Sequence, residues 1–393
     1  MRRLLSQDQL AIQEAARTFS REQLLARYQA REKTETVMDR ALMQQMGSLG
    51  LIGADLGERY GGLGLGSVTA GIIMEEIGYG DFNVAYVQLL GSLMGSILEY
   101  HARPALAAQW IPRVVAGEAL LGLGLTEPRG GSDAGNLALK ACRKGDVYIL
   151  DGEKTSISCA DQVDASVVFA RTGRVEDGPR GVSAFFVPSD LKGLTRTRFD
   201  DIGSKIVGRG SLFFDAVEVP VESMLGDENK GFSQVMRGFD FSRALIGLQC
   251  TGAAQASLDE AWAYASEREA FGVPIAQYQG VSFPLAEAES QIAAIRALSY
   301  ETLALRDAGL PHTREAAMCK WMGPKFAYEA IHQCLLTMGH YGWTHDTPHQ
   351  QRLRDVMGLQ IGDGTAQIMK LIIARERVGK VAVQYAPQDA RRV

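Results

Sequence analysis

The sequence predicts an α+β protein built from a helical region, a β-rich region and a second helical region. Apolar residues recur at three- and four-residue spacings in the first and last thirds of the chain. Short β-branched runs separated by turn residues fill the part between them. A chain of 393 residues with 46% hydrophobic content is too large for one core to keep growing. We therefore expect domains at 1–120, 121–230 and 231–393.

The first region reads as helices interrupted by glycines. Its second and third helices are apolar on most faces, which predicts that they are buried. Pro104 is suited to the first turn of a fourth helix. The helical segments are expected at about 7–51, 67–78, 84–100 and 104–117.

The middle region predicts an antiparallel barrel or sandwich. Four strands are expected, at 147–150, 165–170, 182–187 and 211–214. The Asp151-Gly152 pair directly after the first of them predicts a hairpin turn.

The last region predicts a four-helix bundle, because four long helical segments follow one another. They are expected at about 232–268, 278–308, 313–339 and 363–384. His345 and His349 have the spacing of a helical metal site, but Pro348 lies between them. The two histidines are therefore expected in a loop, packed or solvated.

Composition excludes several classes of protein. The formal net charge of −5 provides no broad basic surface for nucleic acid. The five cysteines are widely spaced and odd in number, so they indicate neither a disulfide framework nor a zinc site. The N-terminus has no apolar signal segment, and no apolar run is long enough to span a membrane. We expect a soluble protein of the reducing cytoplasm, without a bound metal.

The glycine-rich segments match none of the common nucleotide or hydrolase motifs. Gly122-x-Gly124 lacks the third glycine of the dinucleotide fingerprint, because Glu127 occupies its place. There is no phosphate-binding P-loop sequence. The segment 130–134 fails the nucleophile-elbow pattern at its last position.

Two segments of the middle region resemble the acyl-CoA dehydrogenase superfamily. The first is Leu-Thr-Glu-Pro at 125–128 with Gly-Ser-Asp at 131–133, and the second is Asp-Gly-Glu-Lys-x-x-Ile-Ser at 151–158. The resemblance implies the three-domain fold of that superfamily, FAD as cofactor, and α,β-dehydrogenation of an acyl-CoA.

The same resemblance assigns roles to single residues of these motifs. Leu125 and Thr126 would contact the flavin ring, and Ser158 would contact its polar edge. Ser132 would lie near the phosphate region and the substrate. Flavin chemistry needs such donors, because the ring gains negative charge when hydride arrives. The alternative for Thr126 is that it only ends a strand before Pro128.

The segment around Arg268-x-x-Phe271-Gly272, with Gln279, resembles a second cofactor motif of the superfamily. There the arginine reaches the FAD pyrophosphate of a neighbouring subunit, and a guanidinium fork matches phosphate oxygens. The alternative is an ion pair with Glu267 or Glu269. If the resemblance holds, the chain is at least a dimer and, by analogy, a homotetramer made of two dimers.

Residues 239–243 resemble the helix that meets the acyl-CoA thioester, with Asp240 and Arg243 at its polar positions. Some members of the superfamily carry their catalytic glutamate at the position of Ser242. Serine cannot act as that base, so the carboxylate is expected elsewhere.

Residues 362–367, Gly-Asp-Gly-Thr-Ala-Gln, stand where the superfamily commonly has Tyr-Glu-Gly-Thr. The resemblance makes Asp363 the base that removes the α-proton. The alternative is that Asp363 only caps the following helix. Gly362 and Gly364 are expected at the substrate, and Thr365 and Gln367 at the cofactor.

Tyrosine replaced by Gly362 and glutamate replaced by Asp363 both remove bulk beside the reacting carbons. This favours a cyclic or branched acyl group, and the Gly-Asp-Gly-Thr version resembles the cyclohexanecarboxyl-CoA dehydrogenase branch. The thioester oxygen would accept a hydrogen bond from the Asp363 backbone N–H. An electron-transfer flavoprotein is the expected oxidant.

Two other functions stay open. A flavin oxidase of the nitroalkane-oxidase type also uses aspartate as its base. A DNA-associated flavoprotein is disfavoured by the acidic charge balance. The superfamily's Gln-x-x-Gly-Gly-x-Gly segment is degenerate here at 336–342, which leaves the role of His340 undetermined.

Overall fold

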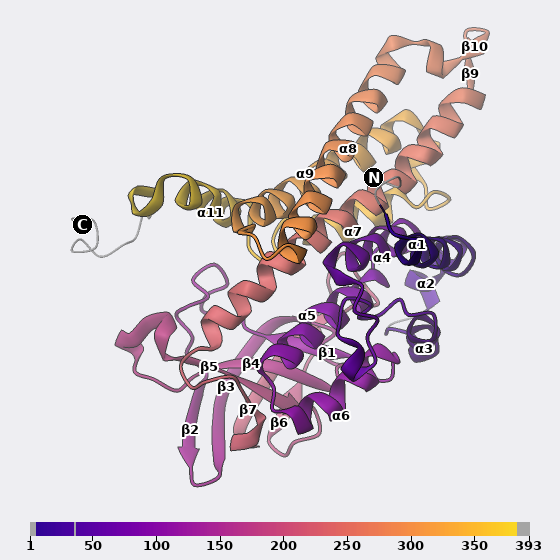
Figure 1. Ribbon diagram of the computed structural model, residues 1–393. Helices are drawn as coiled ribbons and strands as arrows, with labels where there is room; N and C mark the ends of the chain where they lie inside the picture. Colours follow the sequence, from indigo (N-terminus) through magenta and orange to yellow (C-terminus); the bar gives the residue numbers. More distant parts are fainter. Residues whose placement is uncertain (1–4, 35–36, 383–393) are drawn as a thin grey trace. The chain divides into compact units, whose positions relative to one another are not determined.

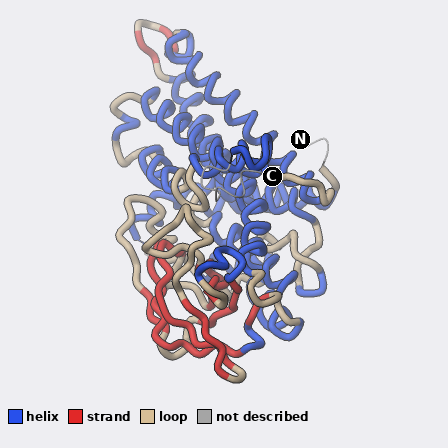
Figure 2. The backbone as a smooth tube through the Cα atoms, turned by 90° about the vertical axis from the view of Figure 1, so that its left-hand side faces the viewer, coloured by secondary structure: helices blue, strands red, loops and turns tan. Residues whose placement is uncertain are grey.

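The computed structural model describes residues 5–34 and 37–382. The chain divides into two compact units. The first contains 1–30, 71–85 and 240–393, and the second contains 31–70 and 86–239. Helical and β-rich parts follow each other along the chain in the predicted order (Figures 1 and 2).

The second unit is built on one eight-stranded sheet, ordered β6-β7-β3-β2-β4-β5-β8 with β1 paired to β4. Most of its neighbouring strands are antiparallel, as predicted, but β1 and β2 both run parallel to β4. The strands are β1 (Leu121–Gly124), β2 (Lys140–Lys144), β3 (Val147–Ser158), β4 (Ala165–Arg171), β5 (Val182–Pro188), β6 (Leu194–Arg196), β7 (Arg209–Pro220) and β8 (Met224–Leu225).

The hairpin expected at Asp151-Gly152 is wrong. Strand β3 passes through this pair and stays hydrogen-bonded to β7, with a register shift between Leu150 and Gly152. A side chain at Gly152 would meet the Leu139 backbone at 3.0 Å. Glycine therefore allows the Leu139 backbone to approach β3 closely at this bulge. The reversal lies earlier, between β2 and β3, where Gly145 has a φ of 60°.

The core of the second unit is formed by alternate residues of these strands. Buried side chains include Leu150, Val168, Phe185 and Val217. The unit also contains α3 (Arg40–Ser48), α5 (Ala85–His101) and α6 (Pro104–Val115). Trp110 of α6 lies edge-on to Phe186 of β5 at 4.8 Å, which packs this helix against the sheet.

The first unit is helical. Its helices are α1 (Gln7–Phe19), α8 (Gln279–Asp307), α9 (Thr313–Thr337), α10 (His349–Gly358) and α11 (Ala366–Val378), with parts of α2 (Tyr28–Thr34), α4 (Gly66–Gly80) and α7 (Gly231–Glu267). A short hairpin of β9 (Glu269–Ala270) and β10 (Val273–Pro274) joins α7 to α8 at the tip of that helix pair (Figure 1).

The helices differ from the prediction in two places. The helical pattern over about 7–51 is divided into α1, a π-helical turn at Ser20–Leu24, a 3₁₀ turn at Leu25–Arg27, then α2 and α3. Helix α10 was not predicted, and it begins directly after Pro348. The loop expected for His349 is therefore wrong: this residue opens α10 and is fully buried.

Helices α7 and α9 approach closely through two glycines. Gly247 and Gly323 face each other, and a side chain at Gly323 would meet the Gly247 Cα at 2.9 Å. Helices α10 and α11 pack against α9. This arrangement places the segment between α10 and α11 against the middle of α9.

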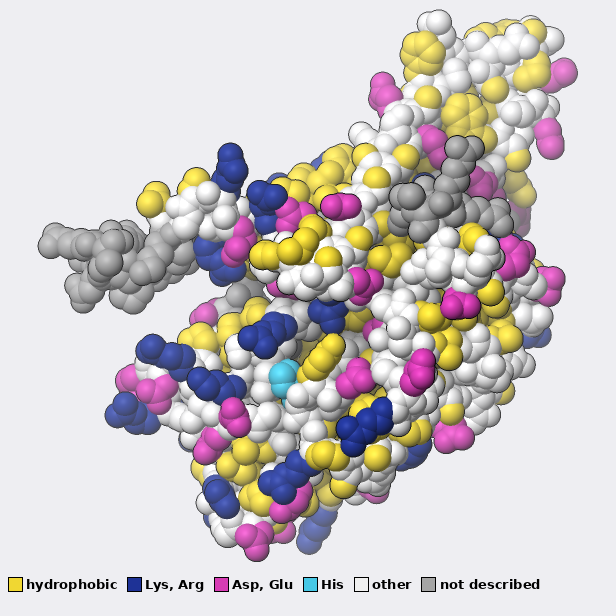
Figure 3. All heavy atoms as spheres, viewed as in Figure 1, with side chains coloured by type: hydrophobic (Ala, Val, Ile, Leu, Met, Phe, Trp, Pro, Cys, Tyr) yellow, Lys and Arg dark blue, Asp and Glu magenta, His cyan; other side chains and the backbone are white. Residues whose placement is uncertain are grey.

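Positive and negative side chains are mixed over the face visible in Figure 3. Across the described ranges, every helix is too short or too polar to traverse a lipid bilayer.

Candidate active site

Asp363 lies in the segment between α10 and α11. The segment leaves α10 through turn hydrogen bonds that end with Gly362 N donating to Gly358 O at 3.0 Å. Asp363 and Gly364 then take φ values of 54° and 97°. Left-handed backbone is uncommon outside glycine, although aspartate tolerates it better than most residues. The backbone thus turns sharply at the predicted base.

Thr365, rather than Asp363, caps helix α11. Its side-chain oxygen accepts from Ile368 N at 3.3 Å, in extended N-cap backbone. The capping alternative for Asp363 is therefore wrong. The half-buried Asp363 carboxylate makes no hydrogen bond or ion pair with any residue that the structure describes. Such an acceptor is available to a ligand.

Arg243 supplies one positive charge near Asp363. It is buried on α7, where its guanidinium donates to the Asp240 carboxylate at 3.0 Å. The other oxygen of Asp240 accepts from the Thr313 hydroxyl at 2.6 Å, at the start of α9. Burial lowers the pKa of Arg243, and the charges of Asp240 and Asp363 oppose that shift. Asp240 thus holds Arg243 in place.

Lys320 supplies a second positive charge, which sequence reasoning missed. Its ammonium is buried on α9 and donates to Leu359 O at 2.6 Å and to Gly364 O at 3.2 Å. Burial lowers its pKa to about 8, against the opposing effect of the Asp363 charge. A signal existed: Lys320 falls on the helical stripe of small buried residues that includes Ala316 and Ala327.

The predicted flavin contacts of the second unit lie at the ends of β1 and β3. Leu125 is buried, Thr126 and Ser158 are half-buried, and Ser132 is exposed on the loop after β1. Thr155 N donates to Thr126 O at 2.8 Å, which ties the β1 end to β3. The hydroxyls of Thr126 and Ser158 have no hydrogen-bond partner in the described part of the chain.

A buried ion pair supports this corner of the sheet. Lys154 Nζ lies 2.8 Å from Glu127 Oε1 and donates also to Leu125 O at 3.0 Å. The Glu127 carboxylate further accepts from Ala138 N and Leu139 N. Burial lowers the pKa of Lys154 to about 8. For Glu127, burial acts to raise the pKa, but the Lys154 charge and the hydrogen bonds bring it below the usual value.

The hairpin between α7 and α8 carries Arg268 and Phe271. Arg268 is exposed and forms no ion pair with Glu267, Glu269 or any other described residue, so the ion-pair alternative is wrong. Phe271 is 98% exposed with a φ of 53°. A large apolar side chain held in strained backbone toward solvent indicates a function outside its own chain. Gln279, the first residue of α8, is exposed beside it.

Three family profiles together match most of the chain. Those for the N-terminal, middle and C-terminal domains of acyl-CoA dehydrogenase match residues 6–118, 122–217 and 229–377. The chain belongs to the acyl-CoA dehydrogenase family. Its three regions therefore form the predicted fold, and the protein is an oxidoreductase that acts on the CH–CH bond of an acyl-CoA.

Three relatives illustrate this similarity. A probable acyl-CoA dehydrogenase of Bacillus subtilis, YngJ, is 34% identical over 95% of this chain and 98% of its own. The butyryl-CoA dehydrogenase structure from Megasphaera elsdenii has a TM-score of 0.91 at 29% identity, over 95% of this chain and 99% of its own. A Mycobacterium smegmatis glutaryl-CoA dehydrogenase in complex with FADH2 has a TM-score of 0.90 at 25% identity, covering 97% of each chain.

Members of the acyl-CoA dehydrogenase family depend on FAD, and the described residues fit this group. Thr126 and Ser158 offer hydroxyls without protein partners, which suits the polar edge of an isoalloxazine ring. Arg268 offers an unpaired guanidinium for a pyrophosphate. Thr365 and Gln367 open helix α11, and their cofactor roles stay predictions. His340, whose role the sequence leaves undetermined, is exposed before the 3₁₀ turn Tyr341–Trp343.

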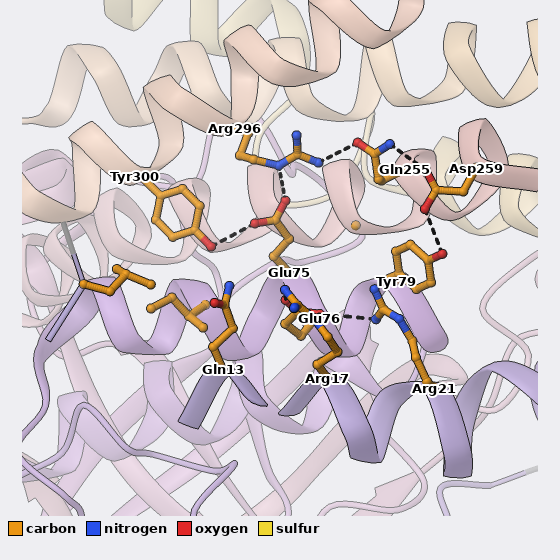
Figure 4. Close-up of a pocket in the computed structure, with 13 residues that line it drawn as sticks. Gln13, Arg17, Arg21, Glu75, Glu76, Tyr79, Gln255, Asp259, Arg296 and Tyr300 are labelled. Atoms are coloured by element: carbon orange, nitrogen blue, oxygen red, sulfur yellow. Dashed lines mark hydrogen bonds and ion pairs between the residues drawn. The ribbon is translucent and has the colours of Figure 1, made fainter. Parts of the chain in front are cut away.

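A cavity of about 370 Å³ in the first unit of this dehydrogenase is a separate feature (Figure 4). None of the predicted site residues lines it. Glu75 bridges Arg296 and Tyr300, while Arg17 and Arg21 both reach Glu76. These opposite charges pair with one another, so the cavity is lined by a network of ion pairs.

Proposed function

We propose that this acyl-CoA dehydrogenase desaturates a cyclic or branched acyl-CoA, with Asp363 as the base. One observation carries the proposal. The Asp363 carboxylate is half-buried beside two cations and has no hydrogen-bond or ion-pair partner among the described residues, while Thr365 takes the helix cap. A group with no structural bond of its own, in strained backbone, fits a role in chemistry.

The reaction removes a proton from the carbon next to the thioester. The Asp363 carboxylate takes this proton, and Arg243 and Lys320 supply positive charge near it. The Asp363 N–H makes no backbone hydrogen bond in the described part of the chain, so it is available to the thioester oxygen. FAD, when bound, accepts the hydride that leaves the β-carbon.

The width of the acyl group is inferred from Gly362. An added Cβ at this residue would meet only Gly358 O, at 3.6 Å, which is an ordinary contact. Gly364 is different, because its φ of 97° requires glycine and a side chain would meet Met369 at 2.5 Å. The backbone therefore does not demand glycine at 362, and its missing side chain leaves room beside Asp363 for a ring or branch.

The cofactor site is proposed to be shared between subunits. The exposed, unpaired Arg268 and the exposed Phe271 fit a role in holding FAD bound to a neighbouring chain. On this basis the enzyme is a homotetramer made of two dimers. An electron-transfer flavoprotein is the proposed oxidant and the cytoplasm the proposed compartment, both by family resemblance.

The test is anaerobic reduction of the purified FAD enzyme by a panel of thioesters. Cyclohexanecarboxyl-CoA and isobutyryl-CoA should bleach the flavin with a higher kcat/KM than butyryl-CoA or glutaryl-CoA. Faster reduction by the straight-chain thioesters would refute the assigned acyl class. Oxygen consumption with nitroalkanes and no reduction by any thioester would refute the reaction itself.

A further inference from the structure

Lys320 occupies an unusual environment for a lysine. Its side chain is 1% exposed and comes from the middle of α9, close to the crossing with α7 at Gly247 and Gly323. A buried ammonium is costly unless it is hydrogen-bonded and paired with negative charge. Packing alone therefore does not explain a charged side chain at this buried position.

The two acceptors of Lys320 bracket the predicted base. Leu359 O belongs to the C-cap residue of α10, and Gly364 O to the residue directly after Asp363. One ammonium thus ties both ends of the segment that holds Asp363 in its left-handed conformation. Apart from this tether, the turn bonds of the α10 end and the Thr365 cap fix the segment.

The charges around Lys320 point to Asp363 as its counter-charge. Asp363 and the thiol of Cys250 favour the ammonium form, while Arg243 disfavours it. Cys250 is buried, and burial raises its pKa to about 12, so the thiol is neutral near pH 7. With a pKa of about 8, Lys320 is charged at and below neutral pH.

We propose that Lys320 is a positioning residue for the base, holding the Asp363 segment through its two carbonyl bonds. This rests on the proposed role of Asp363. Lys320 and Arg243 then have different tasks. Lys320 holds the backbone of the loop that carries Asp363, whereas Arg243 is itself held by Asp240. Neither carbonyl bond involves the Asp363 side chain, so the carboxylate keeps its capacity to accept a proton.

The test compares Lys320→Met, which keeps length but removes charge and donors, with Lys325→Met as the matched control. Lys325 lies on the same helix and forms an ion pair with Glu329 on the surface. The FAD-loaded variants are reduced anaerobically by a saturating acyl-CoA over a range of pH. FAD content and Tm are measured in parallel.

For Lys320→Met we expect flavin reduction to slow by roughly 100-fold, because a misplacement of about 1 Å has about that effect. The acid limb of the rate–pH profile should move to higher pH, since a positive charge near the carboxylate is removed. A structural role alone would lower Tm without moving this limb. Lys325→Met should behave as the wild type.

A wild-type rate and an unmoved acid limb in Lys320→Met would overturn the proposal. If that variant loses FAD, Lys320→Gln replaces it: the neutral amide keeps donors, so the limb should still move, and an unmoved limb overturns the proposal. The Asp363→Asn variant distinguishes failure of the Lys320 proposal from failure of the proposed function. If the flavin of this variant is reduced at the wild-type rate, Asp363 is not the base, whatever the Lys320 variants show.

Discussion

Asp363 combines three properties that rarely occur together in a residue with only a structural role. Its backbone is left-handed, its carboxylate has no bonded partner among the described residues, and two buried cations lie near it. A structural aspartate at this place would cap α11, but Thr365 does so. The proposed role as the base accounts for these properties together.

Gly362 gives a prediction at the same scale. In Gly362→Tyr the added ring should fill the space beside Asp363 and lower kcat/KM for cyclohexanecarboxyl-CoA by roughly 10- to 200-fold. The value for butyryl-CoA should change far less. The fold should persist, because the backbone tolerates a Cβ there. Equal losses for both thioesters in steady-state kinetics would refute the pocket assignment.

At the scale of single elements, sequence patterns identified most helices and four of the eight strands of the main sheet, but not their turns. The Asp151-Gly152 pair looks locally like a hairpin turn, and only the pairing with β7 reveals a bulge. Helix α10 was hidden by Pro348, which stands directly before it. Asp363 was predicted as the base because its Gly-Asp-Gly-Thr motif is local in sequence. Lys320 was missed because its acceptors lie 39 and 44 residues away.

The ion pair between β1 and β3 should dominate local stability in the second unit. Lys154→Met leaves the Glu127 charge buried with backbone donors only, which should lower the free energy of unfolding by roughly 3–5 kcal/mol. Urea titration measures this loss. The double variant Glu127→Gln/Lys154→Met should recover part of it. A double variant no more stable than the single one would argue that the pair itself is not the cause.

His349 should make stability depend on pH. Burial, and then the Arg352 charge, lower its pKa from 6.5 to about 4. Between pH 6.5 and about pH 4, His349 therefore binds a proton in the unfolded chain but not in the folded chain. The stabilisation is fully present above pH 6.5 and is lost as the pH falls toward 4, by about 3 kcal/mol. His349→Gln should flatten this part of the unfolding curve, and an unchanged slope would contradict the assignment.

At the scale of the whole molecule, the proposed sharing of the cofactor site between subunits would link FAD binding to assembly. Arg268→Ala removes a guanidinium that no described residue pairs with, so folding should be unaffected. FAD affinity should fall by roughly 10- to 100-fold, the range expected for a lost charge-assisted hydrogen bond. Glu267→Ala is the neighbouring control and should retain FAD.

Sedimentation of the FAD-loaded protein supplies the second readout for the shared site. The wild type should sediment as a tetramer. Removing the flavin should weaken this assembly, because bound FAD would bridge subunits. A monomer with full FAD content would contradict the shared site. So would an Arg268→Ala variant that binds FAD as tightly as the wild type.

The most direct test of the central claim is anaerobic mixing of the Asp363→Asn enzyme, fully loaded with FAD, with cyclohexanecarboxyl-CoA. A general base contributes about 10²–10⁴-fold, so the flavin should bleach at least about 100-fold more slowly than in the wild type, with thioester binding retained. Bleaching at the wild-type rate would contradict the claim, because the proton would then leave to another group.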